Sequence, residues 1–314
     1  MIRCVVSQKR RLEVNGPGGV IESLQDWGAK GAPKRPGQWK RGRSAMELAR
    51  AWLPAVAAGE LPVEVRALLD SRAQLREFQP ETVSAEHLTR LDSFRGEGRN
   101  HDLLLVGSAA AGRTVVAVEG KADEPFSDTI AATLKKALKR NGSNAPTRVR
   151  QLCAAIIGVN DDEQLLDAKG IGGIRYQLVH ATAGTLIEAE AANAVQAVLL
   201  IHEFIGSVDE QTGQPLTRPE RIERNARDLA AFTAALAGRE PATPTGLLGP
   251  FRAPGGGLVP AGLPLWLGKA TRVDANRLAL SSSVETRQPW GFTAASLCSQ
   301  RPDDLGCSPD PARA

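Results

Sequence analysis

Two apolar segments rich in β-branched residues lie close together near the middle of the chain, and they constrain its fold more than any other feature. The first runs from Asn100 to Gly107 and the second from Thr114 to Lys121. Only the short, glycine-containing segment 108–113 separates them, which predicts a hairpin of two buried antiparallel strands. Residues 115–118 are apolar without alternation, so we expect strands that are covered on both faces. This pattern favours an α/β fold.

Three ionisable residues lie on the predicted hairpin. Asp102 opens the first strand, and Glu119 and Lys121 close the second. Because side chains alternate along a strand, Glu119 and Lys121 point to the same face, and Asp102 can lie opposite them. Two carboxylates and an ammonium group then meet at one end of the sheet. Carboxylate oxygens are ligands that Mg²⁺ prefers, so the pattern predicts a metal site there.

A second interpretation of these three residues stays open. An Asp at the start of one strand and a Glu and a Lys on the next can form a cross-strand ion pair on a solvated face. The apolar run before Glu119 argues against a solvated face, because charges on a covered strand must be paired or must bind something. If the ion-pair interpretation holds, the protein would be a structural interaction protein.

Asp102 followed by Glu119-Gly120-Lys121 resembles the signature of the PD-(D/E)XK phosphodiesterase superfamily, which includes many restriction-endonuclease-like folds. The resemblance covers residues 86–204. A further segment, from Arg175 to Gly184, resembles an uncharacterised bacterial branch of that superfamily. His101 stands before Asp102, where the superfamily signature has Pro.

The resemblance implies a mixed sheet flanked by helices, of restriction-endonuclease-like type, and a metal-dependent nuclease. Asp102, Glu119 and the carbonyl of Gly120 would ligate Mg²⁺ or Mn²⁺. Lys121 would position the attacking water and stabilise charge on the phosphate. The substrate would be nucleic acid, DNA in preference to RNA. The alternative is a nuclease-fold module that binds nucleic acid or a partner without turnover.

Four more residues are candidates for supporting roles. Glu97 precedes Asp102 in a glycine-rich loop, and Glu124 follows Lys121 closely, at a position similar to one marked in the bacterial branch. Arg175 and Gln177 belong to the segment that carries the second resemblance, so either could reach a metal-bound phosphate. Exposed polar positions on a helix are the competing interpretation for Arg175 and Gln177. His180, on the apolar face of the same predicted helix, is expected to be a core histidine and not a ligand.

Basic residues gather in two places. Residues 1–50 contain eleven Lys or Arg against four Asp or Glu, a net charge of +7 in a chain whose total is +4. A predicted helix after the second strand carries four cations on its polar side: Lys135, Lys136, Lys139 and Arg140. Both groups favour phosphate contacts, and both are equally typical of solubilising surfaces. Nothing in the pattern decides whether the protein is a homodimer.

Composition excludes several classes of protein. No two of the four cysteines form a C-x-x-C pair, which argues against a zinc site and a disulfide framework, and Cys153 falls in a core helical pattern. No apolar run approaches the length of a membrane span, and the N-terminus lacks the apolar segment of a signal peptide. We therefore expect a soluble, cytoplasmic protein with no membrane partner.

The chain is expected to divide into a main domain with extensions. Residues 1–43 are predicted to be an irregular basic arm, and residues 44–240 the nuclease-like core with its preceding helices. Residues 241–284 form a C-terminal extension with an edge strand at Leu263–Leu267, and residues 285–314 a tail without packed structure. Within the core, the spacing of Leu88, Leu91 and Phe94 predicts a short helix from Glu86 to Phe94. The continuous apolar run from Val195 to Ile201 predicts a central strand.

Overall fold

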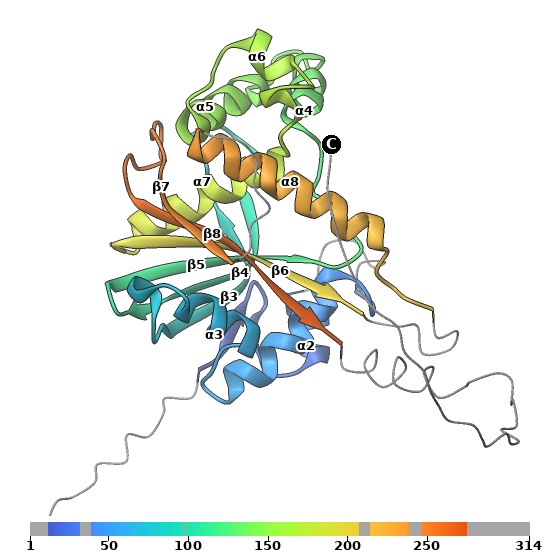
Figure 1. Cartoon of the computed structure of the whole chain (residues 1–314), viewed down its shortest axis with the longest axis vertical. Coiled ribbons are helices and arrows are strands. Elements are labelled where there is room, and N and C mark those ends of the chain that lie inside the picture. The colour runs from blue at the N-terminus through green and yellow to red at the C-terminus, as the bar shows by residue number, and fades with distance from the viewer. Residues whose placement is uncertain (1–11, 32–38, 97, 207–213, 239–245, 275–314) are drawn as a thin grey trace, which may run out of the picture.

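A computed structural model describes residues 12–31, 39–96, 98–206, 214–238 and 246–274, and within them the chain folds around one mixed sheet of eight strands (Figure 1). The strand order across the sheet is β2-β1-β3-β4-β5-β6-β8-β7. The strands are β1 (Val14–Gly16), β2 (Gly19–Ile21), β3 (Gln79–Thr89), β4 (Arg99–Ala109), β5 (Gly112–Lys121), β6 (Gln196–Ile205), β7 (Leu247–Arg252) and β8 (Pro264–Val273). The α/β class is thus confirmed.

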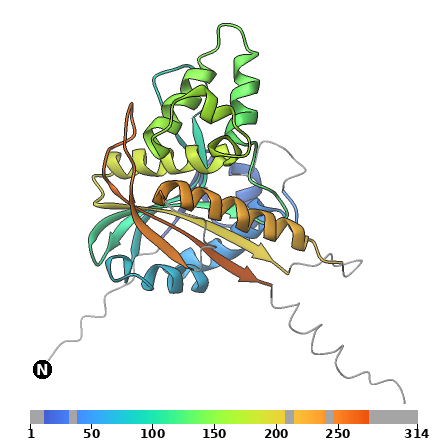
Figure 2. The same cartoon turned by 45° about the horizontal axis from the view of Figure 1, so that its top comes forward.

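Helices cover both faces of this sheet, as Figures 1 and 2 show. One face packs on the first three helices, and the other shares a hydrophobic core cluster with the remaining five. The helices are α1 (Leu24–Lys30), α2 (Ser44–Ala57), α3 (Val63–Asp70), α4 (Ile130–Leu138), α5 (Ala145–Ile157), α6 (Asp162–Leu166), α7 (Tyr176–Ala191) and α8 (Pro219–Ala237). Among these described helices, none is long and apolar enough to cross a membrane. In Figure 1, α4, α5 and α6 form a group that stands beyond α7, away from the sheet.

The predicted hairpin is confirmed as the antiparallel pair of β4 and β5, in which Leu103 faces Val118 and Ala109 faces Gly112. Its turn is tight because Gly112 adopts a φ of +119°, which a residue with a Cβ rarely takes. The predicted central strand is also confirmed. It is β6, which pairs in parallel with β5 on one side and with β8 on the other. Covered on both faces, β5 and β6 need apolar residues at nearly every position.

The predicted helix from Glu86 to Phe94 is wrong. Residues up to Thr89 belong to β3, which pairs with β4 along its length. Glu86 takes a φ of +51°, and the strand changes its orientation there. Val83 and Ala85 pack with the α2 side of the sheet, whereas the side chain of Thr89 bonds to α7. Leu88 is 61% exposed, so its spacing to Leu91 did not mark a core-facing helix.

Two predictions about the ends of the chain also need correction. Residues 1–43 are not irregular throughout, because β1, β2 and α1 form within them and β1 extends the sheet beside β3. The strand expected at the edge is β8, an interior strand between β6 and β7. Pro264 is its first residue, where a missing N–H costs little. Residues 247–273 thus complete the sheet, while residues 285–314 lie outside the described part of the chain.

Candidate functional site

Strand β5 brings two of the predicted site residues into direct contact. Lys121 Nζ lies 2.7 Å from Glu119 Oε1, and both residues are buried, Lys121 being 5% and Glu119 3% exposed. The ammonium group also lies 5.1 Å from the centre of the Phe126 ring, a cation–π distance. Alternation along β5 produces the Glu119–Lys121 contact, as the sequence predicts.

Glu119 accepts hydrogen bonds from three different elements. Besides Lys121, Gln177 at the start of α7 donates to Oε1, and Arg99 at the start of β4 donates to Oε2. Burial by itself would raise the pKa of Glu119, but the charges of Lys121 and Arg99 outweigh it and lower the pKa. The glutamate is therefore ionised and neutralises two buried cations.

Asp102 lies beside this cluster and is held by the backbone of β5. The N–H of Gly120 donates to Asp102 Oδ2 over 2.8 Å, at the point where the pairing of β4 with β5 has ended. Burial, and then the nearby charge of Glu119, raise the pKa of Asp102. The two carboxylates are thus close enough to oppose each other's ionisation. Such a pair favours a bound cation, which would stabilise both charges.

Two histidines, the buried His101 and the partly buried His180, line the side of the cluster that faces α7. Neither ring nitrogen of His101 has a hydrogen-bond partner among the described residues, and the same holds for Nδ1 of His180. Burial, with the charge of Arg99, lowers the pKa of His101 well below its usual range, and burial lowers the pKa of His180 to about 3. These low pKa values keep both rings neutral. That His180 is not a ligand stays a prediction.

A glycine of α7 makes room for this polar layer. A Cβ on Gly184 would lie 2.6 Å from His101 Nε2 and 3.1 Å from Arg99 Cγ. We predict that Gly184→Ala displaces both side chains and lowers the free energy of unfolding by about 1–3 kcal/mol through overpacking, despite the better helix propensity of Ala. Urea denaturation measures this. The double variant Gly184→Ala/His101→Ala should recover part of the loss, and equal stability of wild type and Gly184→Ala would contradict the prediction.

Three of the four residues predicted to support the site lie in different places in the structure. Gln177 joins the site through Glu119. Arg175 instead pairs with Asp228 of α8 at 2.8 Å and so fastens two helices. Glu124 accepts from the N–H groups of Ser44 and Ala122, at 3.3 and 3.2 Å, and anchors the start of α2. Glu97 lies outside the described residues.

The predicted basic helix is α4, and its cations do not gather around the hairpin. They are exposed on the helix group that stands beyond α7 (Figure 1), and Lys136 pairs with Asp128 at 2.6 Å. The cations in question are Lys135, Lys136, Lys139 and Arg140. Their exposure is compatible with both a phosphate-binding and a solubilising role.

Sequence reasoning missed Arg99 and a second buried pair. Glu203 of β6 is 2% exposed, lies beside Lys121 in the sheet register, and pairs with Lys269 of β8 at 2.7 Å. A signal for Arg99 was available, because a cation on a strand that becomes buried needs an acidic partner. The identity of that partner depends on how the side chains are oriented at the end of the hairpin, where Arg99 of β4 reaches Glu119 of β5.

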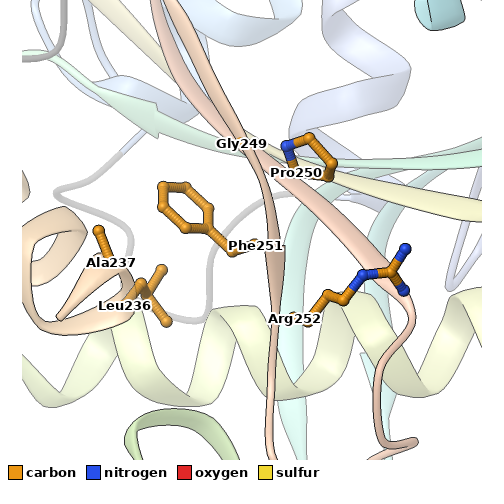
Figure 3. A pocket seen from close by; sticks show the side chains of 6 residues that line it. All are labelled: Leu236, Ala237, Gly249, Pro250, Phe251 and Arg252. Carbon is orange, nitrogen blue, oxygen red and sulfur yellow. The ribbon is translucent and has the colours of Figure 1, made fainter.

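Two surface hollows lie elsewhere. The first, of about 440 Å³, lies between the end of α8 and β7. In Figure 3, Phe251 and Leu236 lie on one side of it and Arg252 extends to the other. The second, of about 490 Å³, lies between α2, α3 and β8, and Glu64 and Arg272 line it. Neither of these two hollows includes Asp102, Glu119 or Lys121, which cluster at one end of the interior strands β4 and β5.

The possible metal ligands at this end of β4 and β5 suit only some metals. Among the described residues, no group of three or more His, Cys, Asp or Glu side chains is arranged to hold a metal ion. Asp102 and Glu119 nevertheless supply two carboxylates, and Mg²⁺ is commonly bound by one or two carboxylates, with water and substrate phosphate as its other ligands. The residues present therefore fit a hard divalent cation and not a zinc centre.

Comparison with known proteins gives a family match. A family model described as "Domain of unknown function (DUF6946)" matches residues 20–273, which include the chain from α1 through β8 and the whole candidate site. No curated protein and no solved structure matches the chain.

Proposed function

We propose that this chain, which belongs to the family described as a domain of unknown function (DUF6946), is a metal-dependent phosphodiesterase that cleaves nucleic acid. One observation carries the proposal. The fold brings Asp102, Glu119 and Lys121 together at one end of β4 and β5, with a 2.7 Å contact between Lys121 and Glu119 and a 2.8 Å bond between Gly120 and Asp102. DNA is the preferred substrate class, and RNA the second.

The arrangement of elements supports a restriction-endonuclease-like core of the PD-(D/E)XK type. A helix, α2, precedes the antiparallel run β3-β4-β5, and α7 then leads to β6, which lies parallel to β5. Both acidic residues and the lysine lie at the same end of this unit.

The residues of the chain would divide the chemistry as follows. Asp102, Glu119 and the carbonyl of Gly120 would hold Mg²⁺ or Mn²⁺, which when bound lowers the pKa of its water and polarises a phosphoryl oxygen. Lys121 would orient the attacking water and stabilise negative charge that grows on the phosphate. Gln177 fixes the orientation of the Glu119 carboxylate through its own donor. The exposed cations of α4 would contact the nucleic-acid backbone away from the reaction centre; they are Lys135, Lys136, Lys139 and Arg140.

One observation favours a different function. Both oxygens of Glu119 already accept donors, two of them from cations, so the cluster is also an ion-pair network. A structural role for the cluster in a binding or interaction protein would need no metal. Cleavage assays separate the two functions.

The test uses plasmid, single-stranded DNA and RNA with Mg²⁺, Mn²⁺ or EDTA. We expect cleavage by the wild type with either metal and none in EDTA. Lys121→Ala should lower the rate about 100- to 1000-fold, because it removes a group that stabilises developing charge. Lys269→Ala is the matched control, since Lys269 also pairs with a buried glutamate at this end of the sheet, and its rate should stay near that of the wild type. Binding of nucleic acid without cleavage would favour the non-catalytic alternative, and absence of metal and nucleic-acid binding would favour the ion-pair network.

A further inference from the structure

We propose that Arg99 binds the phosphate of the substrate: its guanidinium group neutralises Glu119 in the free protein and contacts a phosphate oxygen when Glu119 becomes a metal ligand. This inference rests on the proposed function and assigns a substrate-binding role to a residue that the sequence motif does not include.

Arg99 is buried in contact with Glu119. The residue is 6% exposed, and its Nη2 donates to Glu119 Oε2. Its Nε is buried and has no hydrogen-bond partner among the described residues. A buried donor without a partner costs free energy, so the guanidinium group has an unmet capacity for an acceptor at this site. A phosphate has several acceptor oxygens, which could meet it.

The hydrogen-bond donors divide unequally between the two oxygens of Glu119. Lys121 and Gln177 both donate to Oε1, whereas Arg99 donates to Oε2. Freeing Oε2 for a cation therefore requires the movement of one of these three side chains, and freeing Oε1 requires the movement of two. Arg99 is a cation at Oε2, so a divalent ion that binds this oxygen would compete with the guanidinium group and repel it.

The guanidinium group of Arg99 can move while the aliphatic part of the side chain stays fixed. The Cγ of Arg99 packs against the backbone of α7 at Gly184, where an added Cβ would lie 3.1 Å away. The same helix holds Gln177 on Glu119. A rotation about the terminal bonds of Arg99 moves the guanidinium group without disturbing this packing. Once separated from Glu119, the group needs another anion, because an unpaired buried charge is costly.

The chemistry of the guanidinium group favours phosphate as that anion. Its planar fork of N–H donors matches two oxygens of a phosphate, whereas a lysine ammonium group provides a point charge. Lys121 already supplies a point charge beside Glu119. Arg99 would add a directional contact that fixes the phosphate relative to Asp102 and Glu119.

The experiment compares Arg99→Ala, Arg99→Lys and the wild type in two measurements. In the first, calorimetry without nucleic acid measures Mn²⁺ affinity. Arg99→Ala should bind Mn²⁺ about tenfold more tightly, because the competing cation is gone, whereas a purely structural role would weaken binding. Arg99→Lys keeps the competing charge and should bind as the wild type does.

In the second measurement, steady-state cleavage of DNA with Mg²⁺ gives KM and kcat. Both variants should raise KM about tenfold, because neither provides the fork of donors. Arg150→Ala is the matched control, since Arg150 pairs with Asp162 on the surface of α5, and it should change neither KM nor Mn²⁺ affinity. If Arg99→Ala does not fold, Arg99→Lys still decides, because an unchanged KM for it would overturn the proposal.

The failure of this inference differs from the failure of the proposed function. A wild type that cleaves DNA, together with Arg99 variants of unchanged KM and Mn²⁺ affinity, would overturn the role of Arg99 alone. A wild type that cleaves no nucleic acid with either metal would overturn both.

Discussion

Replacing Glu119 with Gln is expected to lower the free energy of unfolding by about 3–5 kcal/mol, measured in EDTA. The carboxylate neutralises Arg99 and Lys121, which are 6% and 5% exposed and so have little access to water. The amide of the substituted side chain would keep the shape of the glutamate but would leave two buried cations without their anion. The same variant should lose metal-dependent cleavage, because one of the two carboxylate ligands is gone.

Glu203→Gln is the matched control for this prediction. Glu203 is equally buried but pairs with a single cation, Lys269, whose side chain is 19% exposed and can turn towards water. Its loss should cost about 2 kcal/mol, the value of a hydrogen bond to a charged group. Urea denaturation of the two variants side by side measures the difference. A Glu119→Gln variant as stable as Glu203→Gln would show that Arg99 and Lys121 find other partners or solvent.

Acidification from pH 6.5 to pH 5 is expected to reduce the free energy of unfolding. Burial lowers the pKa values of three histidines: His101, His180 and His202. His202 is enclosed by Trp52, whose Nε1 donates to its Nδ1 over 3.0 Å, and by Glu64, 2.9 Å from its Nε2. Below their usual pKa these histidines take up protons in the unfolded chain but not in the folded one. The stability that they provide is therefore present above about pH 6.5 and is lost as the pH falls.

Asp102 acts in the opposite direction. Its pKa is raised in the folded protein, so over this range the folded state holds a proton that the unfolded state does not. A group that is protonated in only one of the two states changes the free energy of unfolding by about 1.4 kcal/mol per pH unit. His180→Gln should therefore flatten the pH dependence by about this amount, and Asp102→Asn should steepen it. Denaturant unfolding at several pH values measures these slopes, and a wild-type stability that is constant from pH 6.5 to 5 would refute the assignment of neutral buried histidines.

The local sequence was sufficient to predict the elements whose residues are compatible with only one kind of secondary structure. The hairpin of β4 and β5 and the strand β6 were predicted, because continuous apolar, β-branched segments must be covered on both faces. The contact between Glu119 and Lys121 was predicted for a similar reason, since residues two apart on a strand share a face whatever surrounds it.

The wrong predictions concern segments whose apolar spacing is compatible with more than one structure, so that pairing with another strand decides between them. Residues 86–94 have apolar residues three apart, yet the first part of this segment is strand, because pairing with β4 supplies its hydrogen bonds. The residues of β1 are too few to signal a strand alone, and they become one only beside β3. The strand β8 was predicted at the edge of the sheet, but it lies inside because β7 pairs with its far side.

Alternation and apolar content are local properties, so the order of residues is enough to show that a buried hairpin carries an acid and an E-x-K pair at one end. Which groups surround that pair depends on how the whole chain packs. Arg99 arrives from the neighbouring strand and Gln177 from α7, and Gly120 bonds Asp102 across the hairpin. Burial is a property of the whole packed chain, and it is burial that forces each of these charges to find a specific partner.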